Sequence, residues 1–355
     1  MAKTTKTAAF FLAAALLAPG ADLAAKTDLT VTSTVPGVTI PDIPGLTDEV
    51  QAISDLNGPY IANSVALANI LGYPIGKAHI EGFQLGVAMG AGMTNMAYFD
   101  ENDPAHENGS IPGIIPSPVL HFGMGLTDRI DVLGKYFSLS SAAVDPHLES
   151  ELATLTDYKL LSIGGKLRYN VVKPTILIPF IFNFGGVTVS LGADFMYGDV
   201  SVKGSYDAKY NGVEVDYGTG PTPVPLDFSG DYEASALYSI FSINAQALVY
   251  FDIIYLFSVY TGFGLSGNLG YTEIRSDAEG DLSTDDPAYN LAVGDDQVGT
   301  IVFTSENRYT PYYGIPAYIF GLEINLYVLK VTAETMVNLY NLSDVTAQTG
   351  VRIQI

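Results

Sequence analysis

Alternation of apolar and polar side chains is the strongest pattern in this sequence. In YLFSVYTGFGLSGNLGYTE (255–273), odd positions are mainly aromatic or aliphatic, and even positions are mainly Ser, Gly, Asn and Thr. Residues 187–197, 241–249 and 346–355 repeat the pattern. A period of two is that of a β-strand, because successive side chains point to opposite faces. The sequence therefore predicts an all-β protein with long strands.

Two architectures fit long alternating strands. A soluble sandwich packs its apolar faces together and has strands of about five or six residues. An outer-membrane barrel turns its apolar face to lipid, needs about nine to eleven residues per crossing and lines its interior with polar and small groups. The strands here are longer than sandwich strands, and their polar faces are rich in Gly, Ser, Asn and Thr. We therefore expect a closed antiparallel transmembrane β-barrel.

The alternating stretches mark about ten strands, in a range of roughly eight to fourteen. An even number returns both ends of a single-chain bacterial barrel to one side of the membrane. We expect the strands at 81–98, 118–126, 131–140, 159–171, 186–203, 229–250, 255–274, 312–328, 331–341 and 345–355.

The expected connections alternate in length. Outer-membrane barrels have short periplasmic turns and long external loops, so Thr127-Asp128-Arg129 is expected to be a periplasmic turn. The short connections are 127–129, 251–253 and 329–330, and the long ones are 99–117, 141–158, 204–228 and 275–310.

The N-terminal residues carry an export signal. Lys3 and Lys6 precede an apolar run at 8–18, which has the length of a secretory h-region and is too short to span a bilayer as a helix. We expect residues 1–25 to be a signal peptide that is cleaved on export.

The segment between the signal and the first strand lacks the strand pattern. We expect residues 26–78 to form a periplasmic linker followed by a helical or plug segment, and residues 79–355 to form the barrel. Within 46–74 the spacing predicts two short helices, separated by Asn57-Gly58-Pro59. The second helix would either plug the lumen or pack below it. A later apolar run, KPTILIPFIFNFGG (173–186), is expected to be a lipid-embedded or interfacial connection on the periplasmic side.

Charge is unevenly distributed. The chain has 38 acidic and 16 basic residues, a formal net charge of -22 and a mean hydropathy of +0.25. Such a surface repels nucleic acid. The four long connections hold 20 of the 38 acidic residues. Two interpretations remain open: solvation of the loops, or a weak site for divalent cations that bridge the loops to surface glycolipid. The candidate cation-binding residues are Asp277, Glu279, Asp281, Asp285 and Asp286.

Some charged and amide residues fall on the polar face of the predicted strands. Charges on the lipid face near the bilayer midplane cost about 2–4 kcal/mol for Arg or Lys, so we expect these side chains to point into the lumen. Oppositely charged groups there would either pair in a filled barrel or form a polar path. The predicted lumen-facing polar residues are Lys166, Arg168, Asp194, Asn244, Gln246, Asn268, Glu323, Glu334 and Arg352.

Catalytic and cofactor motifs are missing from the sequence. The four histidines, His79, His106, His121 and His147, have no metal-binding spacing, and there is no cysteine and no nucleotide-binding motif. His121 is interpreted as a luminal histidine without a nucleophile. We therefore expect no enzymatic activity, no cofactor and no metal.

The chain resembles bacterial outer-membrane β-barrel proteins of the single-chain, porin-like kind with an N-terminal periplasmic helix. The resemblance covers most of residues 46–355 and rests on AHIEGFQLGVAMGAG (78–92), GLTDRIDV (125–132) and the alternating C-terminal strand. Two features differ: the chain ends in Ile355 where such barrels often end in Phe or Trp, and it has no Trp. Tyrosines would supply the aromatic belts, for instance Tyr250, Tyr255, Tyr312, Tyr313 and Tyr327.

This resemblance implies a location in the outer membrane of a Gram-negative-type bacterium, with outer-membrane lipid and the barrel assembly machinery as partners. The polar lumen favours a passive channel or transporter for small solutes. The acidic connections, and the narrowness of a barrel of about ten strands, favour the alternative of a surface-exposed, adhesin-like binding or structural protein with a filled lumen.

Overall fold

A computed structural model describes residues 26–33, 46–74, 76–99, 108–141, 154–179, 181–216, 220–287, 289 and 297–355. The predicted signal peptide at 1–25 lies outside these residues. The elements are β1 (Lys26–Ser33), α2 (Leu46–Asn69), β2 (Phe83–Phe99), β3 (Asn108–Gly125), β4 (Ile130–Ser140), β5 (Thr154–Val172), β6 (Thr175–Ile178), β7 (Phe182–Asp216), β8 (Pro221–Ile253), β9 (Phe257–Ser283), β10 (Gln297–Tyr309), β11 (Gly314–Leu326), β12 (Leu329–Asn338) and β13 (Val345–Gln354).

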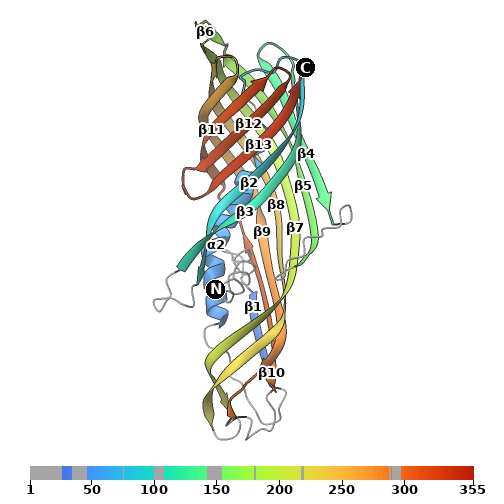
Figure 1. Ribbon diagram of the computed structural model, residues 1–355, viewed down its shortest axis with the longest axis vertical. Coiled ribbons are helices and arrows are strands. Elements are labelled where there is room, and N and C mark those ends of the chain that lie inside the picture. The colour runs from blue at the N-terminus through green and yellow to red at the C-terminus, as the bar shows by residue number, and fades with distance from the viewer. Residues whose placement is uncertain are drawn as a thin grey trace.

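Ten of these strands form a closed antiparallel ring (Figure 1). The order around the ring is β2, β3, β4, β5, β7, β8, β9, β11, β12 and β13. The last strand closes the ring on the first, with Val345 opposite Met93 and Gln354 opposite Gln84. The predicted barrel and its strand number are therefore confirmed.

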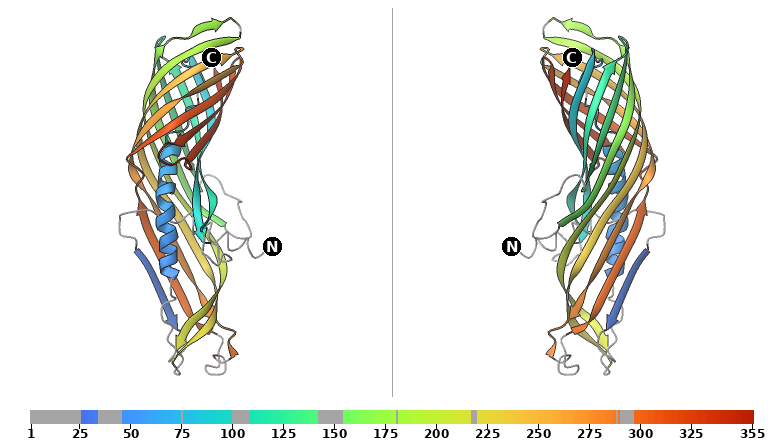
Figure 2. Two further views of the ribbon diagram at one scale, coloured as in Figure 1. Left: turned by 90° about the vertical axis from the view of Figure 1, so that its left-hand side faces the viewer. Right: turned by 90° about the vertical axis from the view of Figure 1, so that its right-hand side faces the viewer.

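A curved sheet extends from one end of the barrel (Figures 1 and 2). It contains the far parts of β7, β8 and β9, followed by β10 and β1, which pairs with β10. The prediction of long loops at 204–228 and 275–310 is therefore wrong for most of their length. The acidic residues suggested loops, but they alternate with inward apolar residues such as Leu226, Ile274 and Leu282, which are buried. The extension is thus held together by its own apolar inner face.

The outer face of the barrel is apolar. Soluble proteins rarely expose a continuous apolar surface of this kind, whereas lipid requires one. We call these exposed residues the lipid-facing belt: Leu85, Val87, Met89, Leu120, Phe122, Ile163, Leu167, Val189, Leu191, Ile243, Phe263, Leu265, Leu269, Phe320, Val351 and Ile353.

Tyrosines lie at both ends of this belt. Tyr312 and Tyr313 are exposed just before β11, and Tyr327 is exposed just after it. β11 has 13 residues, which at the usual rise and tilt of barrel strands cover roughly 30 Å along the barrel axis, close to the thickness of a bilayer core. Tyr255 is also exposed. The prediction for Tyr250 is wrong, because its side chain is 1% exposed and stacks inside the barrel on Tyr260, with ring centroids 5.3 Å apart.

The predicted pair of short helices is a single helix, α2, which continues through Pro59. A proline inside a helix removes a hydrogen bond and costs about 3 kcal/mol. Every side chain from Ile61 to Ile70 is buried, so tertiary packing offsets this cost. None of the described helices is long and apolar enough to cross a membrane.

Candidate functional site

The lumen of the barrel is occupied by the protein's own chain. The second half of α2 enters the ring from the end that carries the extension, and the following residues run on to β2 (Figure 2). We call residues 58–74 and 76–82 the plug. Residues 26–33 consequently lie along the extension, whereas the Thr127–Arg129 turn lies at the opposite mouth of the barrel (Figure 1). Both segments were expected to be periplasmic. In a barrel that crosses the membrane between them, they cannot both lie on that side.

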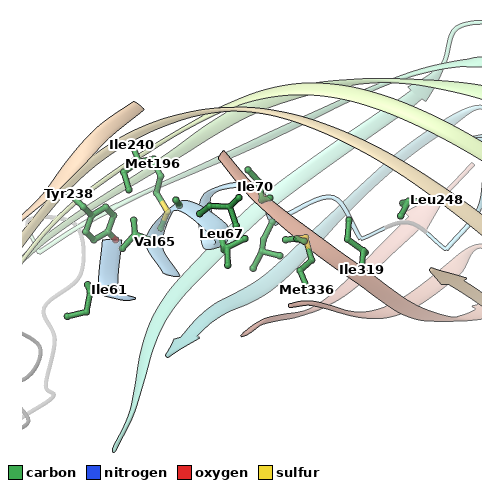
Figure 3. Packing of buried hydrophobic residues seen from close by; sticks show 14 of the residues in the cluster. Ile61, Val65, Leu67, Ile70, Met196, Tyr238, Ile240, Leu248, Ile319 and Met336 are labelled. Carbon is green, nitrogen blue, oxygen red and sulfur yellow. The ribbon is translucent and has the colours of Figure 1, made fainter. Parts of the chain in front are cut away.

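The helical part of the plug, on the side of the extension, is held by apolar contacts. Figure 3 shows Val65 and Leu67 of α2, and Ile70 directly after it, among side chains of the barrel wall. These wall residues are fully or almost fully buried and include Met196, Ile240, Leu248, Ile319 and Met336. The part of the lumen around Val65, Leu67 and Ile70 is therefore a packed hydrophobic core.

A row of small residues on β2 makes room for the plug. Gly86, Ala88, Gly90 and Gly92 follow one another on the inner face of the strand. A Cβ atom at Gly92 would lie 2.6 Å from the backbone oxygen of Ser64 in α2. A Cβ atom at Gly90 would lie 2.9 Å from Leu71 Cδ1. The glycines thus provide a groove for the helix.

Lys135 joins the end of α2 to the wall. Its Nζ donates to the backbone oxygens of Asn69 and Leu71, at 2.8 Å for Leu71, and lies 3.0 Å from Asp194 Oδ1. A cation at this position complements the negative end of the helix dipole. Asp194 also accepts hydrogen bonds from Tyr73 Oη at 2.8 Å and Asn244 Nδ2 at 2.6 Å.

A second ion pair fastens the plug near β2. Arg168 donates from Nε and Nη2 to Asp131 Oδ2, at 2.9 and 2.7 Å. Its Nη1 donates to the backbone oxygen of Lys77 at 2.7 Å, and Asp131 accepts from the backbone of Ile80 at 3.2 Å. His79 Nδ1 lies 2.7 Å from Asp131 Oδ1. Each charged wall group thus binds both its partner and the plug.

A third ion pair repeats this arrangement. Arg352 Nη2 donates to Glu323 Oε2, and Arg352 Nη1 donates to the backbone oxygen of Pro74 at 2.7 Å. Glu323 also accepts from the backbone of Gly76 at 2.7 Å. The backbone of Gly72 donates to Gln348 Oε1 at 2.7 Å. The wall therefore holds the plug mainly through its backbone.

A small polar cavity remains beside the plug. Its volume is about 20 Å³, enough for about one water molecule. Lys166, which donates to Gln246 Oε1 at 2.9 Å, and Glu334, which accepts from Tyr260 Oη at 2.7 Å, are among its lining residues. Lys166 Nζ lies 4.6 Å from the ring centroid of Tyr73.

The nine predicted luminal residues all lie inside the barrel. Seven are buried, and Gln246 and Glu334 are partly buried. Asp131 and Lys135 are two luminal residues that were not predicted, although Val132 and Tyr136 alternate with them and are exposed. That alternation was sufficient to find them. Gln348 alternates in the same way on the C-terminal strand, whereas Tyr73, which belongs to the plug, had no comparable signal. His121 is also buried on the inner face.

The predicted cation-binding loop is not a loop. Asp277, Glu279 and Asp281 lie at alternate positions of β9. Alternate residues of a strand are about 6.6–6.8 Å apart, too far for three carboxylates to converge on one ion without help from another segment. Asp285 and Asp286 follow β9, and Asp286 Oδ1 accepts from the backbone of Tyr289 at 3.2 Å. Among the described residues, no three His, Asp or Glu side chains are placed to hold a metal ion.

Asp128 and Tyr232 have shifted pKa values and lie outside the membrane-spanning segments. In the Thr127–Arg129 turn, the hydrogen bond and charge of Lys173 lower the pKa of Asp128. On the extension, burial raises the pKa of Tyr232. Neither shift brings a proton-transfer group into contact with a nucleophile.

The closed ring, its lipid-facing belt and its polar interior together define a bacterial outer-membrane β-barrel protein. The family model described as Lsa36-like matches residues 54–355, so the chain belongs to the Lsa36-like family. No curated protein matches the sequence.

Several solved outer-membrane structures are similar to this chain. The Ralstonia pickettii toluene transporter TbuX is 12% identical, with 84% of this chain and 94% of that chain covered and a TM-score of 0.24. The translocator domain of the autotransporter NalP from Neisseria meningitidis is 10% identical, with coverages of 83% and 94% and a TM-score of 0.28. Ail, the attachment invasion locus protein of Yersinia pestis, is 12% identical, with coverages of 64% and 100% and a TM-score of 0.20.

Proposed function

We propose that this protein is a surface-exposed binding or structural protein of the outer membrane, anchored by a barrel with a filled lumen. The observation that carries this proposal is the plug. Apolar packing holds the helical part of the plug. The pairs Lys135–Asp194, Arg168–Asp131 and Arg352–Glu323 hold the end of the helix and the residues that follow it. With its lumen filled in this way, the barrel serves as a membrane anchor rather than as a path for solutes.

The extension supplies the surface for binding. It continues the strands well beyond the belt, and its outer face carries cross-strand neighbours of the same charge, such as Asp231 with Glu279 and Glu233 with Asp277. Like charges opposite each other destabilise a sheet, so this face is suited to contact with water or with a partner rather than to packing. At this face, divalent cations would bridge the acidic side chains to anionic surface glycolipid.

The proposal includes several expectations from the sequence. The signal peptide directs export and is cleaved, the assembly machinery inserts the barrel, and the protein has no enzymatic activity. If so, the protein fractionates with outer membranes and migrates in a heat-modifiable manner in detergent gels. Recovery as a soluble periplasmic protein would contradict the proposal.

A gated channel for small polar solutes is the second candidate. Its support is that Lys135, Arg168 and Arg352 are each paired with an acid on the wall itself. If the plug moved, these charges would keep their partners, and a hydrated polar lumen would not contain isolated charges. Opening would nevertheless expose the apolar contacts of α2, which favours the closed state.

A disulfide lock distinguishes the two candidates. The Cβ of Leu71 lies 3.5 Å from the position of a Cβ at Gly90, which is within the range for a disulfide, and the chain has no native cysteine. The variant Leu71→Cys/Gly90→Cys would therefore tie the plug to β2. Each single cysteine variant serves as a control.

The measurement is conductance in planar bilayers. If the protein is a surface anchor, the wild type and both redox states of the double variant are silent. If it is a gated channel, the wild type and the reduced variant conduct and the oxidised variant does not. Conductance that oxidation leaves unchanged would contradict a role for the plug as gate and would show a path around it.

A further inference from the structure

An apolar hairpin projects from the end of the barrel that carries the C-terminus (Figures 1 and 2). After a break at Lys173 and Pro174, β6 resumes the pairing of β5 with β7, with Thr175 opposite Phe184 and Ile178 opposite Phe182. The backbone of Asn170 already bonds to Arg129, so the hairpin lies beyond the Thr127–Arg129 turn. We call residues 175–179 and 181–184 the foot.

The foot exposes apolar side chains on both of its faces. All residues of β6 are exposed, and Ile176 and Ile181 expose 64% and 58% of their surface. A two-stranded hairpin is marginally stable in water. Exposed Ile and Leu on both faces add an unfavourable contact with water, so the foot is suited to an apolar environment.

The outward face of the foot is continuous with the lipid-facing belt. Along β7, the outward positions Leu191, Val189 and Val187 lead to Phe184 and Phe182. On the neighbouring strand, Phe251 lies opposite Phe184, and its ring centroid is 5.7 Å from that of Phe182 and 5.8 Å from that of Phe184. Aromatic side chains are enriched where a barrel meets the membrane interface.

We propose that the foot inserts between the phospholipids of the nearer leaflet and anchors one side of the barrel. A soluble protein is the other conceivable occupant. Continuity with the belt along β7 favours lipid, because no charged residue lies between Phe182 in the foot and Leu191 in the belt.

Tryptophan fluorescence tests this proposal directly, because the chain has no Trp. Leu177→Trp places one reporter on the foot, and Ile181→Trp is a second reporter. Leu191→Trp lies in the middle of the belt and serves as the lipid control, and Val302→Trp lies on the exposed extension and serves as the water control. Each variant is reconstituted in phosphatidylcholine vesicles with ordinary or brominated acyl chains, and heat-modifiable migration verifies folding.

If the foot lies in lipid, brominated chains quench Leu177→Trp as they quench Leu191→Trp, and acrylamide quenches it weakly. The emission maximum should also lie closer to that of Leu191→Trp than to that of Val302→Trp. The proposal is overturned if both foot reporters resist brominated lipid and respond to acrylamide like Val302→Trp. That outcome would assign the exposed hairpin to a partner in the aqueous phase.

Discussion

At the residue scale, Lys135 joins the plug to the barrel wall through several partners at once. It contacts the last turn of α2, Asp194 on β7 and the ring of Tyr73. Its side chain and that of Asp194 are both fully buried. Removing one partner of a buried pair leaves the other charge without compensation, which costs far more than losing an exposed pair.

We predict that Lys135→Met destabilises the folded protein by about 3–5 kcal/mol. The control Lys203→Met removes the half-exposed pair with Glu233 and should cost about 0–1 kcal/mol. Urea unfolding in detergent micelles, followed by circular dichroism, measures both. The double variant Lys135→Met/Asp194→Asn should recover part of the loss, because it no longer buries an unpaired carboxylate. Equal effects of the two lysine variants would refute this role of Lys135.

At the scale of elements, β2 and α2 fit each other through small residues. The inner face of β2 lacks large side chains at positions 86 to 92, and α2 lies in the space that this leaves. Glycine is normally unfavourable inside a strand, because it has no side chain to pack and loses more conformational freedom on folding. In β2 the close approach of the helix backbone compensates for this cost.

We predict that Gly92→Ala destabilises the protein by about 1–3 kcal/mol, since the new Cβ would meet a backbone atom that cannot rotate away. Gly267→Ala is the matched control, because the nearest atom to its Cβ would be 3.7 Å away. That change should alter stability by less than about 0.5 kcal/mol or raise it slightly. The same urea titration compares them, and an unaffected Gly92→Ala would argue against a tightly seated helix.

At the scale of the whole molecule, the chain passes through its own barrel. β1 pairs with β10 on the extension, the plug crosses the lumen, and β2 begins at the opposite mouth beside the C-terminus. If the Thr127–Arg129 turn is periplasmic, as short turns are in such barrels, then β1 lies at the cell surface. The exported N-terminal segment must then be enclosed as the ring closes or must thread through it.

We predict that a membrane-impermeant maleimide labels Thr30→Cys and Val302→Cys on intact cells. Asp128→Cys should react only after the outer membrane is permeabilised. All three positions are exposed, so differences in labelling report the side of the membrane rather than burial. Labelling of Asp128→Cys alone on intact cells would reverse the orientation. Labelling of Asp128→Cys together with Thr30→Cys on intact cells would contradict the passage of the chain through the lumen.

The sequence by itself determined the barrel. Each strand contacts lipid with one side and faces the interior with the other, so successive residues must be alternately apolar and polar or small. This requirement leaves a period of two in the sequence. This period was enough to predict ten strands, their approximate limits at the end of the barrel that carries the Thr127–Arg129 turn, that turn itself and the inward direction of Arg168, Asp194 and Arg352. It also contained Asp131 and Lys135, which we did not recognise.

Only the tertiary structure decided what fills the lumen. Glycines and paired charges on an inner face suit a hydrated path and a backbone plug equally well, so their presence does not distinguish the two. The distinction depends on contacts between distant residues, such as Lys135 with Asn69 and Arg352 with Pro74. The same reason explains Pro59 and the acidic strands of the extension: local preference favours a break or a loop, and packing against the barrel or a neighbouring strand outweighs it.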